Sequence, residues 1–141
     1  MKTGTKKILL IDDDDVILQS VGRFLTLKGG YDVHMASSGL TALKRLEETE
    51  YGFDLVVTDL IIPDVSGFGI ITLIKKKHPD IPVIAITGWG EIPEKLADEM
   101  KADTVIRKPF ELNELGKTID DLLLEQSTII QTSKTTNEGL M

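Results

Sequence analysis

Apolar residues recur along the chain in short continuous runs that are separated by turn-forming and charged residues. Three of these runs, Ile8–Ile11, Leu55–Val57 and Val83–Ile86, are rich in β-branched side chains, which is typical of parallel strands covered on both faces. Two further segments are more polar: Tyr31–Met35 alternates apolar and polar residues, and Thr104–Arg107 is short with polar flanks. The pattern predicts five strands, with the first three segments central in a sheet and the other two at its edges.

Between the predicted strands, apolar residues three or four positions apart mark one face of a helix. Such spacing follows each strand, in the groups Ile17, Val21, Phe24 and Leu25; Leu40, Leu43 and Leu46; Ile70, Ile71 and Ile74; Ile92, Leu96 and Met100; and Leu112, Leu115, Ile119 and Leu122. Ser37 or Ser38 is suited to cap the second helix, and the lysines at positions 75–77 suit the C-terminus of the third.

These alternating units predict an α/β fold: a flavodoxin-like, doubly wound (βα)5 domain with a five-stranded parallel sheet in the order 2-1-3-4-5. In this order the chain reverses direction between the first and third strands, and ligands bind there at the carboxyl ends. The domain is predicted to span residues 6–125, after an N-terminal extension of residues 1–5. Residues 126–141 are polar and rich in Thr and Ser, which predicts a flexible tail or a linker stub.

The composition argues against several classes of function. The chain has 141 residues, no cysteine and a net charge of −7, so thiol chemistry is excluded and a nucleic-acid surface, which needs a basic face, is not expected. No apolar stretch approaches the ~18 residues that a membrane span requires. The segment Met1–Lys7 is polar and basic without a signal-peptide core, so we expect a soluble, cytoplasmic protein.

Acidic residues end two of the central strands. Asp12 and Asp13 follow the first run and Asp59 ends the third strand, so neighbouring strands bring three carboxylates to one crevice. Such a cluster repels itself unless a hard cation holds it, and Mg²⁺ fits oxygen ligands of this kind. Thr87 and Lys108 follow the fourth and fifth strands at the same edge, where a hydroxyl and an ammonium can bind a phosphoryl group. Asp59 is then the expected nucleophile, since a carboxylate can form an acyl phosphate.

Four motifs contain these residues: Ile8-Leu-Leu-Ile-Asp-Asp13, Val57-Thr-Asp-Leu-Ile-Ile-Pro63 with Gly67, Val83-Ile-Ala-Ile-Thr-Gly88, and Lys108-Pro-Phe110. Each motif alone is weak evidence for a protein family, but the four together, in this order and at these intervals, are specific evidence. They resemble the receiver domain of two-component response regulators (CheY-like). The resemblance covers roughly residues 6 to 124.

The resemblance implies a role for each residue of the site. The implied ligands of Mg²⁺ are Asp13, assisted by Asp12, together with Asp59 and the backbone carbonyl of Ile61. Asp59 is also the implied phosphoacceptor. Thr87 is expected to sense the phosphoryl group, and Lys108 is expected to form an ion pair with it. The peptide bond before Pro109 is expected to be cis.

The resemblance also implies partners. The phosphoryl donor is expected to be a histidine kinase or a histidine phosphotransfer protein. Phosphorylation is expected to shift a surface made by the helix around Ile92–Met100, the strand Thr104–Arg107 and the last helix, through which a downstream protein binds and a homodimer can form. No direct contact with nucleic acid or with a membrane is expected. The protein is not expected to be an enzyme beyond self-catalysed phosphoryl transfer and slow autodephosphorylation.

Some positions depart from the family pattern. Val105 stands where the family usually has Tyr or Phe, so the aromatic switch is absent and coupling rests more on Thr87. Ile62 replaces the common methionine before the proline, which is a mild apolar exchange. Ile61 and Trp89 occupy positions that vary in the family and set the lifetime of the phosphorylated state. We hypothesise that these large apolar groups shield the acyl phosphate from water and slow its loss.

Simpler interpretations stay open for single residues. Asp14 and Asp15 fit the acidic first turn of a helix better than a metal site. Thr87 is also suited to cap the glycine-containing loop that follows it. Trp89, between two glycines, either lies over the site or marks a contact surface.

Other functions of the same fold are disfavoured by particular residues. A phosphatase of the haloacid dehalogenase type needs a general acid two residues after the nucleophile, where this chain has Ile61. A flavodoxin binds phosphate in a hydroxyl- and glycine-rich loop after the first strand, where this chain has Asp12–Asp15. A receiver-like module for dimerisation or docking, independent of phosphorylation, is the alternative function. Mg²⁺-dependent labelling of Asp59 by acetyl phosphate distinguishes it from a phosphoacceptor.

Overall fold

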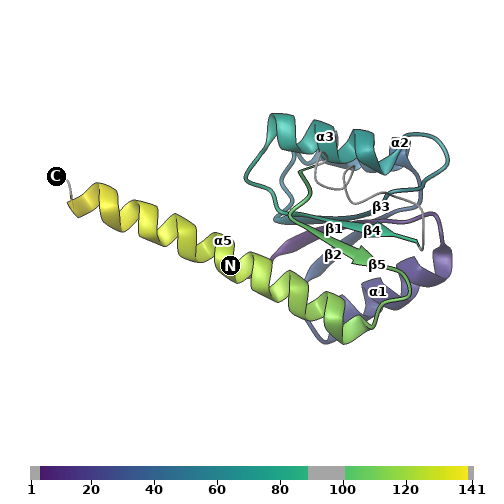
Figure 1. Ribbon diagram of the computed structural model, residues 1–141, viewed down its shortest axis with the longest axis horizontal. Helices are drawn as coiled ribbons and strands as arrows, with labels where there is room; N and C mark the ends of the chain where they lie inside the picture. Colours follow the sequence, from purple (N-terminus) through teal and green to yellow (C-terminus); the bar gives the residue numbers. More distant parts are fainter. Residues whose placement is uncertain (1–3, 89–100, 140–141) are drawn as a thin grey trace.

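The five predicted strands form one parallel sheet in the order β2-β1-β3-β4-β5 (Figure 1). The computed structural model describes residues 4–88 and 101–139, with the backbone alone beyond residue 126. The strands are β1 (Lys7–Ile11), β2 (Asp32–Ala36), β3 (Leu55–Asp59), β4 (Val83–Thr87) and β5 (Thr104–Arg107). The order confirms the predicted fold class, and the two segments predicted to be edge strands, β2 and β5, lie at the edges.

The described residues form four helices: α1 (Asp15–Leu27), α2 (Gly39–Glu48), α3 (Gly67–Lys77) and α5 (Leu112–Gly139). Side-chain oxygens of Asp14, Ser38 and Ser66 accept hydrogen bonds from backbone N–H groups in the first turns of α1, α2 and α3. Asp14 thus caps α1 and Asp15 lies in its first turn, which agrees with the simpler interpretation of these two acids. The predicted fourth helix with Ile92, Leu96 and Met100, and also Trp89, lie outside the described residues.

The helices cover both faces of the sheet, α2 and α3 on one side and α1 and α5 on the other (Figure 1). Successive side chains of a strand point to opposite faces, so each central strand contributes to two cores. In β1, Leu9 and Ile11 belong to the core on the α2 and α3 side, whereas Ile8 and Leu10 belong to the other. All four side chains are fully buried, which explains why the central strands are continuous apolar runs.

Helix α5 is 28 residues long and runs past the sheet toward the C-terminus (Figure 1). The sequence analysis predicted the end of the domain at residue 125 and a flexible tail after it, whereas the backbone is helical as far as Gly139. The helical backbone does not itself assign residues 126–141 to the domain, so that boundary stays a prediction. None of the helices in the described ranges combines the length and the apolar character needed to cross a membrane.

The parallel register brings the carboxyl ends of the central strands to one edge of the sheet. Ile11 pairs with Thr58 across β1 and β3, and Asp59 pairs with Ile86 across β3 and β4. Asp12, directly after β1, therefore emerges beside Asp59 at the end of β3. The strand order reverses at this same pair of strands, which is where doubly wound sheets bind their ligands.

Candidate functional site

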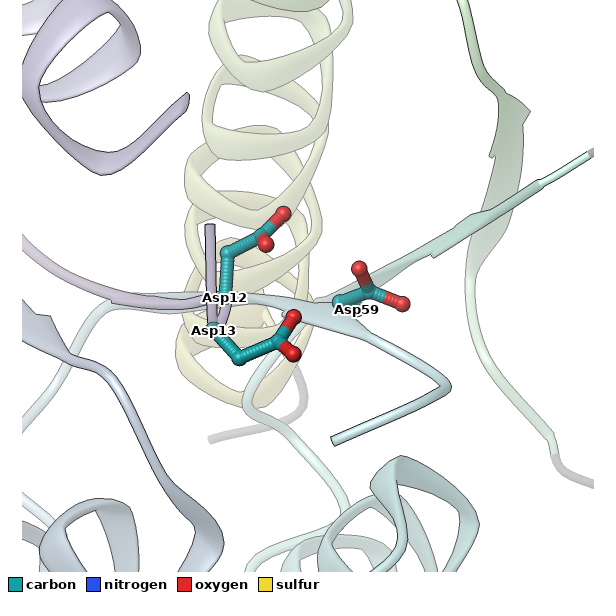
Figure 2. A group of neighbouring side chains, drawn as sticks. All are labelled: Asp12, Asp13 and Asp59. Atoms are coloured by element: carbon teal, nitrogen blue, oxygen red, sulfur yellow. The ribbon is translucent and has the colours of Figure 1, made fainter. Parts of the chain in front are cut away.

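Asp12, Asp13 and Asp59 form an acidic cluster at the carboxyl edge between β1 and β3 (Figure 2). One carboxylate oxygen of each residue lies within 4.8 Å of the others. Asp12 and Asp59 are buried, with 1% and 4% of their surface exposed, whereas Asp13 is exposed. The structure thus brings together the three acids that the sequence predicted to meet.

The backbone just after each strand orients the two buried acids. Asp12 Oδ1 accepts a hydrogen bond from the N–H of Asp14 at 2.9 Å, and Asp59 Oδ1 accepts one from the N–H of Ile61 at 2.9 Å. Each bond closes a tight turn in which an aspartate side chain binds the backbone two residues on. The other oxygen of each acid, Oδ2, lies within ion-pair distance of Lys108.

Lys108, which directly follows β5, supplies positive charge to the cluster. Its Nζ lies 2.5 Å from Asp59 Oδ2 and 3.2 Å from Asp12 Oδ2. The N–H of Lys108 donates to the carbonyl of Thr87 at 2.7 Å, and the bond to Pro109 is cis, as expected. Partial burial lowers the pKa of Lys108, but the hydrogen bond to Asp59 and the charges of Asp12 and Asp59 outweigh it and raise the pKa above its ordinary value.

Asp12 is the least compensated acid of the cluster. Burial raises the pKa of Asp12 and the charge of Asp59 adds to this effect, although the N–H of Asp14 and the charge of Lys108 oppose it. Among the described residues, none donates a hydrogen bond to Asp12 Oδ2, because Lys108 lies at ion-pair distance without the geometry of a hydrogen bond. A buried carboxylate oxygen that accepts no hydrogen bond is unfavourable, and a divalent cation would stabilise it in addition to the ion pair with Lys108.

The donor set is suited to a divalent cation such as Mg²⁺. Mg²⁺ prefers oxygen ligands, binds through one or two carboxylates and keeps some of its water. The cluster offers three carboxylates, one of them exposed toward solvent, and one buried oxygen that no hydrogen bond satisfies. Asp12, Asp13 and Asp59 are therefore able to hold such an ion.

Thr87 and Ile61 lie at the carboxyl ends of β4 and β3, at the same edge of the sheet as the cluster. Thr87 ends β4 and is buried, and its Oγ1 donates to the carbonyl of Gly88 at 3.3 Å. The hydroxyl is therefore bonded to the backbone directly after β4. Ile61 holds Asp59 through its N–H, while its side chain is 54% exposed beside the acids.

Two carboxylates outside the cluster have partners that the sequence analysis did not predict. Asp64 accepts hydrogen bonds from the N–H groups of Gly39 at 2.7 Å and Leu40 at 3.0 Å. Asp103 Oδ2 lies 2.7 Å from Lys75 Nζ and also accepts from the N–H of a β4 residue. The partners are 25 and 28 residues apart in the chain, so no local motif signals either contact.

The doubly wound sheet with an acidic crevice and a lysine at its carboxyl edge defines the class of protein as a CheY-like α/β domain. A family model described as the response regulator receiver domain matches residues 8–120. The chain belongs to this family of response regulator receiver domains.

Curated relatives include regulators and a kinase. The chain is 37% identical over 117 residues to the response regulator RR06 of Streptococcus pneumoniae, covering 82% of this chain and 52% of that protein. It is 34% identical over 127 residues to the sensor kinase CckA of Brucella abortus, covering 88% of this chain and 13% of that protein. The chain thus spans less than two thirds of the length of such relatives.

Solved structures of receiver domains superpose over nearly their whole length. A response regulator receiver domain protein from Clostridium thermocellum has a TM-score of 0.79 and 34% identity, covering 88% of this chain and 98% of that one. A CheY-like receiver domain protein from Methanospirillum hungatei has a TM-score of 0.81 and 29% identity, covering 89% and 98%. Family membership places the chain among the response regulator receiver domains of two-component systems.

Proposed function

We propose that this receiver accepts a phosphoryl group on Asp59 and acts as a phosphorylation-controlled switch in two-component signal transduction. The observation that carries the proposal is the environment of the Asp59 carboxylate. It is buried, its Oδ1 is held by the N–H of Ile61, and its Oδ2 lies 2.5 Å from Lys108 Nζ. A fixed carboxylate beside a cation and two further acids is suited to nucleophilic attack on a phosphoryl group.

In the proposed reaction, an oxygen of Asp59 attacks the phosphorus of a phosphohistidine. The new P–O bond forms as the P–N bond breaks, and the electron pair returns to the imidazole nitrogen of the donor. The proposed ligands of Mg²⁺ are Asp12, Asp13, Asp59 and the backbone carbonyl of Ile61, and the bound ion would neutralise charge on the phosphoryl oxygens. Lys108, already paired with Asp59 Oδ2, is close enough to transfer its ion pair to a phosphoryl oxygen.

An apolar groove beside the site is suited to the donor protein. The groove has a volume of about 430 Å³ and is lined by residues of α1 and of the segment from β5 to α5, namely Val16, Ile17, Ser20, Val21, Lys108, Pro109, Phe110 and Leu112. Lys108 borders both the groove and Asp59, so a helix in the groove would present its phosphohistidine near the acceptor. We therefore propose that a histidine kinase or a histidine phosphotransfer protein docks there.

Thr87 and Lys108 are the residues proposed to transmit phosphorylation to the surface. The N–H of Lys108 donates to the carbonyl of Thr87, so the ends of β4 and β5 are linked by a backbone hydrogen bond. A phosphoryl group on Asp59 is a charged acceptor and would attract the Thr87 hydroxyl more strongly than the carbonyl of Gly88 does. The rotation would shift the population of two states of the β5 and α5 surface, which a downstream protein or a second copy reads.

Labelling with a small phosphodonor tests the proposal. Acetyl phosphate with Mg²⁺ is expected to add one phosphoryl group to the wild-type chain, detected by intact-mass spectrometry, and chelation of Mg²⁺ is expected to prevent it. The Asp59→Asn variant is expected to stay unlabelled with an unchanged circular dichroism spectrum. Asp15→Asn, in the first turn of α1, removes an acid outside the cluster and is expected to be labelled normally.

The alternative function, a docking module independent of phosphorylation, predicts that Asp59 takes no label. A folded wild-type protein that takes no label from acetyl phosphate or from a phosphorylated histidine kinase would support a docking module that works without phosphorylation. Labelling that persists in Asp59→Asn would assign the phosphoacceptor to another residue.

A further inference from the structure

The loop between β3 and α3, residues 60–66, is fastened to the start of α2 by the side chain of Asp64. Asp64 Oδ1 accepts a hydrogen bond from the N–H of Gly39 at 2.7 Å, and Oδ2 accepts one from the N–H of Leu40 at 3.0 Å. These N–H groups belong to the first turn of α2 and have no acceptor within the helix. Asp64 therefore supplies, from a distant loop, hydrogen-bond acceptors that the first N–H groups of a helix normally obtain from its N-cap residue.

The loop and the helix are in direct backbone contact at this point. A Cβ on Gly39 would lie 2.5 Å from Val65 Cβ and 2.8 Å from the Val65 carbonyl oxygen, so a larger residue would push the loop away. At the other end of the loop, the N–H of Gly67 donates to the carbonyl of Leu60 at 3.2 Å. The loop is thus held at its ends and by one ionic side chain in its middle.

The same loop controls the orientation of Asp59. Ile61, whose N–H binds Asp59 Oδ1, precedes Asp64 by three residues, and Pro63 between them restricts the backbone. The N–H groups of Leu40 and Val65 lower the pKa of Asp64, so its carboxylate is charged at neutral pH and interacts favourably with the helix N-terminus. A displacement of the loop at Asp64 would therefore move Ile61 and the carboxylate that its N–H binds.

We propose that Asp64 is a positioning residue: by bridging the loop at 60–66 to the first turn of α2, it fixes Ile61 over Asp59 and thereby sets the affinity of the acidic cluster for Mg²⁺. This inference rests on the proposed function, since the site in question is the one that receives the phosphoryl group. Asp64 touches neither the metal nor the phosphoryl group in this account and acts through Ile61.

Titration of the whole chain with Mg²⁺ by isothermal calorimetry tests the inference. Asp64→Ala is expected to weaken Mg²⁺ binding roughly 10-fold, as loss of a residue that orients a metal ligand commonly does. Asp64→Asn keeps one acceptor oxygen and is expected to recover part of the affinity. Ser38→Ala is the matched control, because it removes the cap of α2 at Thr41 N–H without touching the loop, and is expected to leave the affinity unchanged. Equal effects of Asp64→Ala and Ser38→Ala would overturn the inference.

A second measurement separates this inference from the proposed function. In the metal-free protein, Asp64→Ala is expected to speed hydrogen exchange at the Ile61 amide, whereas Ser38→Ala is expected to leave that amide unchanged. If the Ile61 amide exchanges as slowly in Asp64→Ala as in the wild type, Asp64 does not position Ile61, even if Mg²⁺ binds normally. Failure of the wild type to bind Mg²⁺ would instead refute the proposed function, and the exchange of the Ile61 amide would still decide the role of Asp64. If Asp64→Ala does not fold, Asp64→Asn serves in both measurements.

Discussion

Asp12 lies where a cation can bind, but its buried environment disfavours the charged form of its side chain. Because burial raises the pKa of Asp12 above its ordinary value of 3.8, the folded protein holds this proton more tightly than the unfolded chain. The stability linked to the protonated form is present at pH below about 3.8 and is lost as the pH rises through the raised pKa. At neutral pH without a metal, the charged Asp12 therefore lowers the free energy of unfolding. A bound cation reverses this effect by compensating the charge.

We expect Asp12→Asn to raise the free energy of unfolding without Mg²⁺ by roughly 1 kcal/mol, because the neutral amide removes a buried charge. The amide has the same shape and keeps an acceptor for the N–H of Asp14. With Mg²⁺ the wild type is expected to be more stable than the variant, because the wild type gains stability from the ion and the variant gains little. Urea denaturation with and without Mg²⁺ measures both effects. A variant that is less stable than the wild type in the metal-free state would contradict this account of Asp12.

Ile61 presents a large apolar side chain beside the phosphoacceptor, with 54% of its surface exposed. If this side chain limits the approach of water to the acyl phosphate, Ile61→Ala is expected to shorten the lifetime of the phosphorylated state several-fold. The decay of label after removal of acetyl phosphate measures that lifetime. Leu27→Ala, which truncates another exposed apolar residue at the far end of α1, is the control and is expected to have no effect. Equal decay in the wild type and Ile61→Ala would exclude shielding by Ile61.

At the scale of elements, periodicity was sufficient wherever an element packs against the sheet. The central strands are buried on both faces, so Ile8–Ile11 and Val83–Ile86 stand out as apolar runs, and Asp12 and Asp59 are found at the carboxyl ends of β1 and β3. Lys108 follows the edge strand β5. Contacts between segments that are distant in the sequence could not be predicted, because they depend on how the helices and strands pack in the folded domain. Asp64 is such a case, since nothing near it in the sequence signals the start of α2 as its partner.

Gly67 is another position whose requirement comes from the packing of one element on another. A Cβ there would lie 2.3 Å from the carbonyl oxygen of Asp59 and 2.7 Å from the Cα of Leu60, both of which are backbone atoms. The first turn of α3 therefore packs directly against the end of β3, next to the phosphoacceptor. Only a residue without a side chain allows this approach.

We expect Gly67→Ala to lower the free energy of unfolding by about 3 kcal/mol or more, because backbone atoms of β3 must shift. Gly69→Ala in the same helix is the matched control, since its Cβ would meet only side-chain atoms at 3.6 Å and 3.8 Å. The control is expected to be neutral or to stabilise the protein by up to ~1 kcal/mol, because alanine favours helix. Chemical denaturation of both variants decides the matter, and similar losses at the two glycines would show that the contact with β3 is not the cause.

At the scale of the whole molecule, the site joins two halves of the chain across one sheet. Asp12, Asp13 and Asp59 come from the strands β1 and β3, whereas Thr87 and Lys108 come from β4 and β5. The ion pairs of Lys108 with Asp59 and Asp12 already bridge these halves without a phosphoryl group. A ligand that binds to both halves is therefore able to change the edge of the sheet at β5, where the side chain of Val105 is exposed.

Beryllofluoride with Mg²⁺, which imitates a phosphoryl group on a carboxylate, is expected to shift amide resonances well beyond the acidic cluster. The largest distant shifts are expected at Thr87, Gly88 and residues 101–110, because Lys108 links the site to β4 through the carbonyl of Thr87. Asp59→Asn is expected to remove the response, whereas Val105→Phe leaves the acids intact and tests whether an aromatic residue on the exposed β5 edge enlarges it. If beryllofluoride changes only resonances near Asp12, Asp13 and Asp59, binding at the site does not reach the β5 surface, and the switch must act by another route.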